Sequence, residues 1–368
     1  MSVHETLPPG CEPACHACRH RRLDAAASAA QKQGYLARAL APWVDRVAPV
    51  VPAPAAARLG YRDRVTLTVR GSAGEGWRFG LMRRDEHVPI HGCPVHTRRV
   101  RGLVALLAGR LPYLPDWPLA YLHVSGAQAV LVVKARTTSP EVLGEVTPAL
   151  AALGIEGLWL HHHPSAGRKL FARSGWELAW GAPRSRDAGG LWHGPTAFMQ
   201  AMPSLHGRSL AEAAGHLEPG PATPVLDLCC GIGASLRAWR TAGSPALGVE
   251  LSGEAVELAA RNAPGATVLR GTCVDRLPQV RDWWRSVDGV RVAYVNPPRS
   301  GLEAPVLAAL ADELRPRRIG YLSCSAGTLA RDLAVLESAG YDVERIVPYD
   351  FFPFTHHVET LALASLRT

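Results

Sequence analysis

The second half of the chain alternates short apolar runs with segments of helical periodicity. Five apolar runs have the length of buried strands, at residues 225–228, 246–251, 267–270, 291–295 and 319–323. Apolar positions recur at helical spacing from about Ala234 and again over roughly 253–262. Strands that alternate with helices predict a parallel, doubly wound α/β sheet.

The end of the chain breaks this alternation. "ERIVPYD" (344–350) and "HVETLALASL" (357–366) are two expected strands with no helix between them. Parallel neighbours need a long crossover, so strands joined this closely pair antiparallel. We therefore expect an antiparallel hairpin at the edge of the sheet.

The first half of the chain predicts an α+β domain with arginines on its strands. Its expected elements are a hairpin of residues 61–71 and 77–90 around "SAGEG", a hairpin over 120–136 that turns at Ser125–Gly126, a helix over 141–154 and a strand over 155–164. Two stretches rich in Pro, Ala or Gly are the expected linkers, at 49–57 and 181–190. We predict three parts: a segment with a cluster of cysteines (1–48), an α+β domain (49–195) and an α/β domain (196–368).

Charge separates the two halves of the chain. The net charge is +8; residues 1–195 hold 24 Lys and Arg against 14 Asp and Glu, whereas residues 196–368 hold 16 against 18. A basic excess confined to one half suggests that this half faces a polyanion such as nucleic acid. The start of the chain is polar, and no apolar run approaches the roughly 20 residues of a membrane span. We therefore expect a cytoplasmic protein without a membrane partner.

A glycine-bearing turn follows the first strand of the second half. In "VLDLCCGIGASL", Asp227 ends the strand and Gly231 and Gly233 allow the backbone to approach a ligand. Glu250 ends the next strand, where a carboxylate can hold ribose hydroxyls. A dinucleotide site would have a third glycine at the position of Leu236. The motif therefore favours S-adenosylmethionine (SAM) over NAD as the ligand. The alternative is a tight turn that binds no ligand.

Two further segments carry groups that could act on a substrate. In "YVNPPRSGL", two prolines fix the backbone after Asn296, and Arg299 follows where an amino-directed methyltransferase usually has an aromatic residue. In "YLSCSAGTLARDL", Cys324 stands where a strand gives way to a helix. Glu359 opens an apolar strand, where a carboxylate needs a partner or a role. Taken singly, each of these residues also fits a structural role: a proline-rich turn, a buried thiol or a solvated strand end.

These segments resemble the RNA uracil-C5 methyltransferases. The matching motifs are "FMQ", "DLCCGIGASL", "NPPRSGL", "SCSAGTLARDL" and "FFPFTHHVETLAL", with "YRDRVTLTV", "GLMRRD", "HGCPVH" and the cysteine cluster in the first half. They occur in the family's order and cover most of the chain. The resemblance implies that residues 1–48 form a cysteine-cluster segment, residues 49–195 an α+β RNA-recognition domain and residues 196–368 a SAM-dependent methyltransferase domain. Asn296 before "PPR", and a chain that lacks an N-terminal OB-type (TRAM) domain, are most similar to the members that methylate a 23S rRNA uridine.

The resemblance implies a role for each matching residue. Cys324 is expected to be the nucleophile and Glu359 the base. The expected SAM contacts are Gln200, Asp227, Cys229, Gly231, Gly233, Glu250 and Asn296, and the expected uracil contacts are Asn296 and Arg299. The sequence departs from the family pattern at Met202, Cys229 and Ala234. The expected chemistry is addition of the Cys324 thiolate to C6 of uracil, which predicts that Arg299 and the following helix lower the thiol pKa.

Three cysteines crowd the N-terminus and a fourth stands apart. "CEPACHAC" spaces Cys11, Cys15 and Cys18 as C-x3-C-x2-C, and Cys93 lies in "HGCPVH". Four cysteines can hold zinc or an iron–sulfur cluster, and the spacing alone leaves both open. The resemblance implies a structural [4Fe–4S] cluster, with zinc as the alternative.

Several functional alternatives remain open from the sequence. The preferred substrate is 23S rRNA, and a tRNA T-loop uridine is the main rival. An N-methyltransferase would use Asn296 to hold an amine and would not need Cys324. A non-catalytic iron–sulfur or zinc protein that binds RNA would not bind SAM. We expect a monomer.

Overall fold

The chain folds into two units, each of which draws on two separate segments. The computed structural model describes residues 7–367. One unit combines residues 23–54 with residues 202–367, and the other combines residues 7–22 with residues 55–201. This division differs from the predicted one, because residues 23–48 leave the cysteine segment and join the C-terminal unit. The functional labels of the three predicted parts stay predictions.

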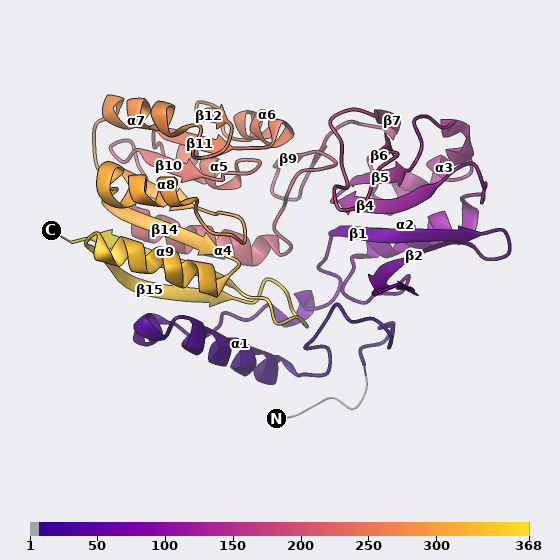
Figure 1. Cartoon of the computed structure of the whole chain (residues 1–368), viewed down its shortest axis with the longest axis horizontal. Helices are drawn as coiled ribbons and strands as arrows, with labels where there is room; N and C mark the ends of the chain where they lie inside the picture. The colour runs from indigo at the N-terminus through magenta and orange to yellow at the C-terminus, as the bar shows by residue number, and fades with distance from the viewer. Residues whose placement is uncertain (1–6, 368) are drawn as a thin grey trace. The chain divides into compact units, whose positions relative to one another are not determined.

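The C-terminal unit is built on a seven-stranded sheet in the order β12-β11-β10-β13-β14-β16-β15 (Figure 1). Its strands are β10 (Val225–Leu228), β11 (Ala246–Glu250), β12 (Thr267–Arg270), β13 (Val292–Val295), β14 (Arg318–Ser323), β15 (Tyr341–Tyr349) and β16 (Glu359–Leu366). Strands β10 to β14 are parallel, and β16 pairs antiparallel with both β14 and β15. The predicted doubly wound sheet and its final hairpin are confirmed. Strand β16 lies inside the sheet and β15 forms the edge.

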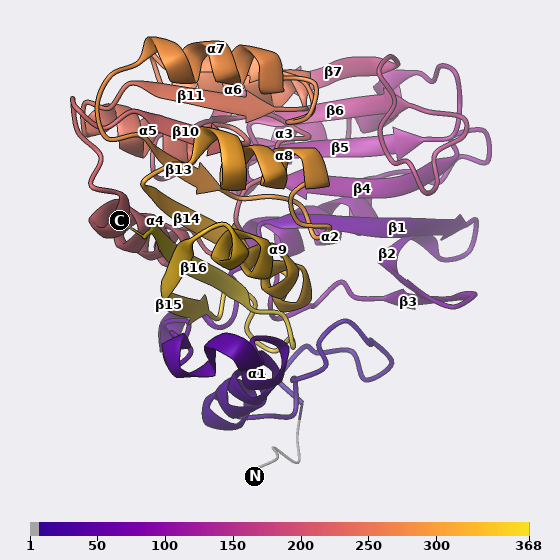
Figure 2. The same cartoon turned by 60° about the vertical axis from the view of Figure 1, so that its left-hand side comes forward.

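Helices cover both faces of this sheet. One face packs against α4 (Pro203–Leu217), α5 (Ala234–Thr241) and α6 (Gly253–Asn262). The other face packs against α7 (Leu277–Ser286), α8 (Ala304–Ala308) with the π-helix Ala309–Leu314, and α9 (Ala326–Ser338). Figure 2 shows α8 and α9 in front of the strands that they cover. In α9, Leu329, Leu333 and Leu336 are buried at helical spacing, as the sequence pattern predicts.

Helix α1 (Ala25–Ala39) and the short helix Ala41–Arg46 were not predicted from the sequence. Leu36, Leu40 and Trp43 are buried in the core of the C-terminal unit. Lys32 on α1 forms a buried ion pair with Asp350, directly after β15. The segment that follows hydrogen-bonds to the edge of β15. Residues 23–54 therefore cover the β15 edge of this sheet.

The N-terminal unit has a second seven-stranded sheet in the order β3-β2-β1-β4-β5-β6-β7. Its strands are β1 (Arg64–Ser72), β2 (Gly76–Arg83), β3 (Glu86–Pro89), β4 (Leu119–Ser125), β5 (Gln128–Val133), β6 (Gly157–His162) and β7 (Trp176–Gly181), followed by a small pair, β8 (Ser185–Arg186) and β9 (Trp192–His193). The predicted hairpin over 120–136 is confirmed as β4 and β5. The hairpin of 61–71 is confirmed for β1 and β2, but the predicted second strand, 77–90, forms two strands, β2 and β3, which pair antiparallel with each other. One face of the sheet packs against α2 (Arg98–Arg110).

The predicted helix over 141–154 is wrong. The segment instead forms short turns of helix, Pro140–Leu143, α3 (Thr147–Leu150) and Ala151–Leu153. Gly144 and Pro148 lie within the predicted helix, and both residue types disfavour a helix interior. Among residues 7–367, no helix is long and apolar enough to cross a membrane.

Candidate active site

The carboxyl ends of three parallel strands bring the candidate residues to one edge of the C-terminal sheet. Strands β10, β13 and β14 end immediately before Cys229, Asn296 and Cys324. The backbone N–H of Asn296 donates to Leu228 O at 3.1 Å, which holds the first two ends together. Strand β16 runs the opposite way, so its first residue, Glu359, lies at the same edge. This edge is where ligands bind in open α/β sheets.

Cys324 and Glu359 are neighbours because of the pairing of β14 with β16. Ser323 lies opposite Thr360, so the residue after Ser323 and the residue before Thr360 face each other at the strand ends. The Cys324 thiol is half-buried. Burial raises its pKa and the Glu359 carboxylate adds to this effect, whereas the charge and hydrogen bond of Arg299 lower it. The predicted lowering of the thiol pKa is wrong, because burial and Glu359 outweigh Arg299.

Glu359 is a carboxyl group held out of water. Only 4% of the residue is exposed. Burial raises the pKa of its carboxyl to about 7, although the nearby Arg299 guanidinium opposes the change. A carboxyl with this pKa can both take up and release a proton near neutral pH, which is what a general base requires.

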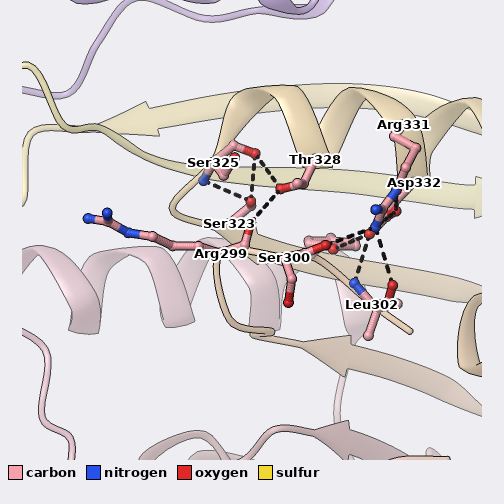
Figure 3. Close-up of polar contacts among 9 residues, drawn as sticks. Arg299, Ser300, Leu302, Ser323, Ser325, Thr328, Arg331 and Asp332 are labelled. Atoms are coloured by element: carbon pink, nitrogen blue, oxygen red, sulfur yellow. Dashed lines mark hydrogen bonds and ion pairs between the residues drawn. The ribbon is translucent and has the colours of Figure 1, made fainter. Parts of the chain in front are cut away.

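Hydroxyl groups fix the backbone on both sides of Cys324 (Figure 3). Ser323 Oγ accepts from the Ser325 N–H at 3.1 Å and donates to Ser325 O at 3.0 Å. Thr328 Oγ1 lies 3.1 Å from Ser325 O and 3.2 Å from Arg299 O. Thr328 therefore connects the turn that contains Cys324 to the loop that carries Arg299.

Asp332 anchors the same loop from helix α9. Its carboxylate is fully buried and accepts from the Leu302 N–H at 3.0 Å and from Tyr321 Oη at 2.6 Å. Arg331 pairs with Asp332 and donates to Ser300 O and Leu302 O, as Figure 3 shows. Asp332 was not predicted from the sequence as a residue of the site. Its position beside Leu329 and Leu333 on the buried face of a helix could have indicated it, because a buried carboxylate needs a hydrogen-bond partner.

Glycine is required at two positions of the first turn, Gly231 and Gly233, for different physical reasons. Gly231 has φ +55°, and a Cβ at this position would meet nothing within 4 Å. Its N–H donates to Glu250 Oε2 at 3.1 Å, while Glu250 Oε1 accepts from the Ser252 N–H. Gly233 has φ +83°, and a Cβ there would lie 2.9 Å from Ala259 Cα. Gly231 thus leaves space beside Glu250, whereas Gly233 allows α5 and α6 to pack closely.

Asp227 has no exposed surface. Trp239 Nε1 donates to Asp227 Oδ2 at 2.9 Å, and Oδ1 has no partner among the described residues. Burial raises the pKa of the Asp227 carboxyl to about 7. Asp227 therefore connects β10 to Trp239 of α5. A direct contact of Asp227 with SAM stays a prediction.

Comparisons with known proteins bear on this site. A family model described as tRNA (Uracil-5-)-methyltransferase matches residues 286–366, which include all the residues of Figure 3. The 23S rRNA (uracil(1939)-C(5))-methyltransferase RlmD of Bordetella pertussis is 30% identical over 95% of this chain and 78% of its own length. The chain belongs to the RNA uracil-C5 methyltransferase family. Members of this family are methyltransferases, and the protein is therefore an enzyme.

Another relative agrees with this assignment, and a solved structure has the same fold. An uncharacterized RNA methyltransferase of Thermosynechococcus vestitus is 27% identical over 95% of this chain and 82% of its own. The crystal structure of the Pyrococcus abyssi tRNA (uracil-54, C5)-methyltransferase, in complex with S-adenosyl-L-homocysteine, has a TM-score of 0.74 at 21% identity. It covers 97% of this chain and 86% of that one. At this identity the likeness concerns the fold alone.

Gln200 belongs to the N-terminal unit of the methyltransferase. Its Oε1 atom is buried and has no hydrogen-bond partner among the described residues. Met202, where the family has Asn, is buried at the start of α4 in the other unit. Contact of Gln200 with SAM stays a prediction.

The N-terminal cysteines of this methyltransferase lie in a tightly turned segment. Arg21 donates to the carbonyl oxygens of Glu12, Pro13 and Cys15, and a Cβ on Gly10 would lie 2.6 Å from Gly92 O. Burial raises the pKa of the Cys18 thiol to about 11, and Cys93 adds to the effect. Nevertheless, no group of three or more Cys, His, Asp or Glu side chains in residues 7–367 is arranged to hold a metal ion. The binding of a cluster by Cys11, Cys15, Cys18 and Cys93 therefore stays a prediction.

Proposed function

We propose that the protein transfers a methyl group from SAM to C5 of a uridine in RNA through a covalent bond from Cys324 to C6. The observation that carries the proposal is the convergence of a half-buried thiol, a buried carboxyl and an arginine at one sheet edge. Arg299 acts on the pKa of both Cys324 and Glu359. This pairing of a nucleophile with a base suits addition to the uracil ring followed by elimination.

Each step of the reaction has a group in this chain. The Cys324 thiolate bonds to C6, and the electron pair of the C5–C6 double bond moves toward O4. The Asn296 amide can donate to O4 and accept from N3–H, which stabilises the negative oxygen. When bound, SAM would supply an electrophilic methyl group to C5, its S–CH3 bond would break, and S-adenosylhomocysteine would leave. Glu359 then removes the C5 proton, and cleavage of the C6–S bond releases Cys324.

The turn after β10 fits the binding of SAM. Open space next to Gly231 allows a ligand to approach the backbone. Both oxygens of Glu250 accept backbone N–H groups at this turn, so the carboxylate is already oriented for ribose hydroxyls. The N-terminus of α5 faces this turn and favours polar groups.

The direct test is the product of the reaction. We expect purified protein, SAM and unmodified 23S rRNA to yield 5-methyluridine, measured by mass spectrometry of the digested nucleosides. We prefer rRNA because the relative at 30% identity is an rRNA enzyme, and a tRNA transcript assayed in parallel decides between the two. A methylated amino group, or no methylation of either RNA, would contradict the proposal. We further propose that the enzyme acts as a cytoplasmic monomer.

The pH dependence of the reaction should show the effect of Arg299 on the pKa of Glu359. Activity is expected to rise with pH through about 7, because Glu359 must lose its proton to act as a base. Replacement of Arg299 by Gln removes a charge that lowers the pKa of Glu359 and of Cys324. The rising limb of a single-turnover pH–rate profile should therefore move toward higher pH by about one unit. Arg285→Gln, on the exposed end of α7, should leave the profile unchanged.

The outer face of the N-terminal sheet has the charge pattern of an RNA contact. Arg70 on β1 lies directly opposite Arg78 on β2, and both charges act on His87 of β3. Like charges in opposed positions of a sheet are destabilising, and although Glu75 pairs with Arg78, an anionic partner would offset the remaining repulsion between the two arginines. Helix α2 packs on the other face. We propose that RNA phosphates lie along Arg70, Arg78 and the exposed Thr66.

Salt dependence tests this RNA face. RNA affinity of the wild type should fall steeply with salt concentration, because bound phosphates release counterions. The double variant Arg70→Ala/Arg78→Ala should lower the slope of log affinity against log salt by about 1.4, from two single-strand contacts. Arg110→Ala, at the end of α2 on the other face, serves as the matched control. Equal slopes in the double variant and the wild type would contradict the proposal.

We also propose that Cys11, Cys15, Cys18 and Cys93 bind a [4Fe–4S] cluster. Four thiols of adjoining loops and the electrostatic effect of Cys93 on Cys18 support it. Protein purified without oxygen should contain iron and sulfide and be brown. Colourless protein that contains zinc would show the alternative.

A further inference from the structure

Two thiols meet beside the proposed SAM site. Cys229 Sγ and Cys273 Sγ are 3.8 Å apart, although 44 residues separate them in the chain. Cys229 directly follows β10, and Cys273 lies in the turn after β12. Both are present as free thiols. The reaction proposed above uses neither thiol as a nucleophile.

The thiol pair joins two loops that flank Glu250. The loop of Cys273 is tied to this residue by a hydrogen bond from the Gly271 N–H to Glu250 O at 3.0 Å. The loop of Cys229 is tied to it by the Gly231 N–H, which donates to the Glu250 carboxylate. A covalent bond between the sulfurs would therefore link the two loops across the group proposed to hold the ribose of SAM.

The two sulfurs differ in reactivity. Either sulfur can donate in the hydrogen bond between the two thiols, and this bond lowers the pKa of Cys273 while it raises that of Cys229. The lower pKa gives Cys273 more thiolate, which is the nucleophilic form. Cys230 is a contrast: its sulfur is buried beneath Gly248, and burial raises its pKa well above the ordinary value. The pair thus has an attacking thiol and a second thiol in contact with it.

We propose that Cys229 and Cys273 form a reversible disulfide that closes the SAM site when the protein meets a peroxide. This inference rests on the proposed function. The sulfurs must approach from 3.8 Å to about 2.05 Å.

The oxidation balances with hydrogen peroxide alone. The Cys273 thiolate attacks one peroxide oxygen, the O–O bond breaks, and hydroxide leaves and is protonated to water. The product is a sulfenic acid on Cys273. The Cys229 sulfur attacks this sulfur, the S–O bond breaks, and a second water leaves. The two thiols lose two electrons and two hydrogens in total, and a dithiol reductant reverses the change.

Peptide mapping tests the bond independently of SAM. The experiment uses Cys324→Ala protein, so that oxidation of the proposed nucleophile does not contribute. After peroxide treatment and alkylation, trypsin should release residues 209–237 linked to residues 271–276, with a mass about 2 Da below the sum of the two peptides alkylated at Cys230 alone. The link should persist in a Cys230→Ser variant and be absent in a Cys273→Ser variant. Absence of the linked peptide in the parent protein would overturn the inference.

Calorimetry with SAM tests the consequence. Reduced protein should bind SAM, peroxide should lower the affinity at least about tenfold, and dithiothreitol should restore it. Cys273→Ser protein should keep its affinity through the same treatment. A linked peptide with unchanged SAM affinity would overturn closure of the site. Failure of the reduced protein to bind SAM would instead refute the proposed function, which the peptide map does not depend on.

Discussion

Glu359→Gln is expected to accumulate as a covalent protein–RNA complex, whereas Cys324→Ala is expected to form none. Gln cannot remove the C5 proton, so the adduct at C6 is methylated but cannot eliminate. Ala provides no nucleophile, so no bond to RNA forms. The measurement is a slowly migrating protein–RNA band that survives denaturing electrophoresis after incubation with SAM. Both variants should lose all measurable turnover.

Two controls make this result specific. RNA that contains 5-fluorouridine should trap the wild-type protein in the same band, because fluorine cannot leave as a cation. Glu344→Gln changes an exposed carboxylate on the neighbouring strand β15 and should turn over normally without trapping. If wild-type protein methylates RNA but neither experiment yields a band, catalysis is not covalent. Methylation by Cys324→Ala would point to an N-methyltransferase that does not use the thiol.

Asp332→Ala is expected to lower the free energy of unfolding by about 3–5 kcal/mol, the cost of breaking a buried charged network. The fully buried Asp332 carboxylate accepts from Tyr321 Oη and the Leu302 N–H. Ala leaves both donors without their acceptor in the core. Urea denaturation measures the loss, and Asp312→Ala on the exposed surface should stay within about 0.5 kcal/mol of wild type.

The same substitution should alter catalysis through Arg299. Asp332 and Arg331 hold residues 300–302, which continue the loop of Arg299. When this loop is released, the guanidinium no longer lowers the pKa of Glu359, and the pH–rate profile should move to higher pH as in Arg299→Gln. Asp332→Asn keeps one oxygen acceptor and should lie between wild type and Asp332→Ala in both measurements. A stability loss without a pH shift would limit Asp332 to a structural role.

Local patterns in the sequence determined the class of fold and the position of the candidate nucleophile. Strand length, helical spacing and the alternation of the two depend on nearby residues, so residues 225–228 and the helix from Ala234 were predicted at their observed places. The same holds for the turn at Cys324. The prediction of a helix over 141–154 was wrong for a local reason, because Gly144 and Pro148 interrupt a segment whose apolar spacing is helical.

Only the tertiary structure decided how the site is charged and what holds it. The direction of the Cys324 pKa depends on burial and on Glu359, which lies 35 residues away but pairs through β16. Helix α1 joins the C-terminal unit through the Lys32–Asp350 ion pair, across 318 residues. The contact of Cys229 with Cys273 depends on two loops that meet at one sheet edge. Burial and electrostatic interaction depend on distance in space, and the spacing of residues along the chain does not contain that distance.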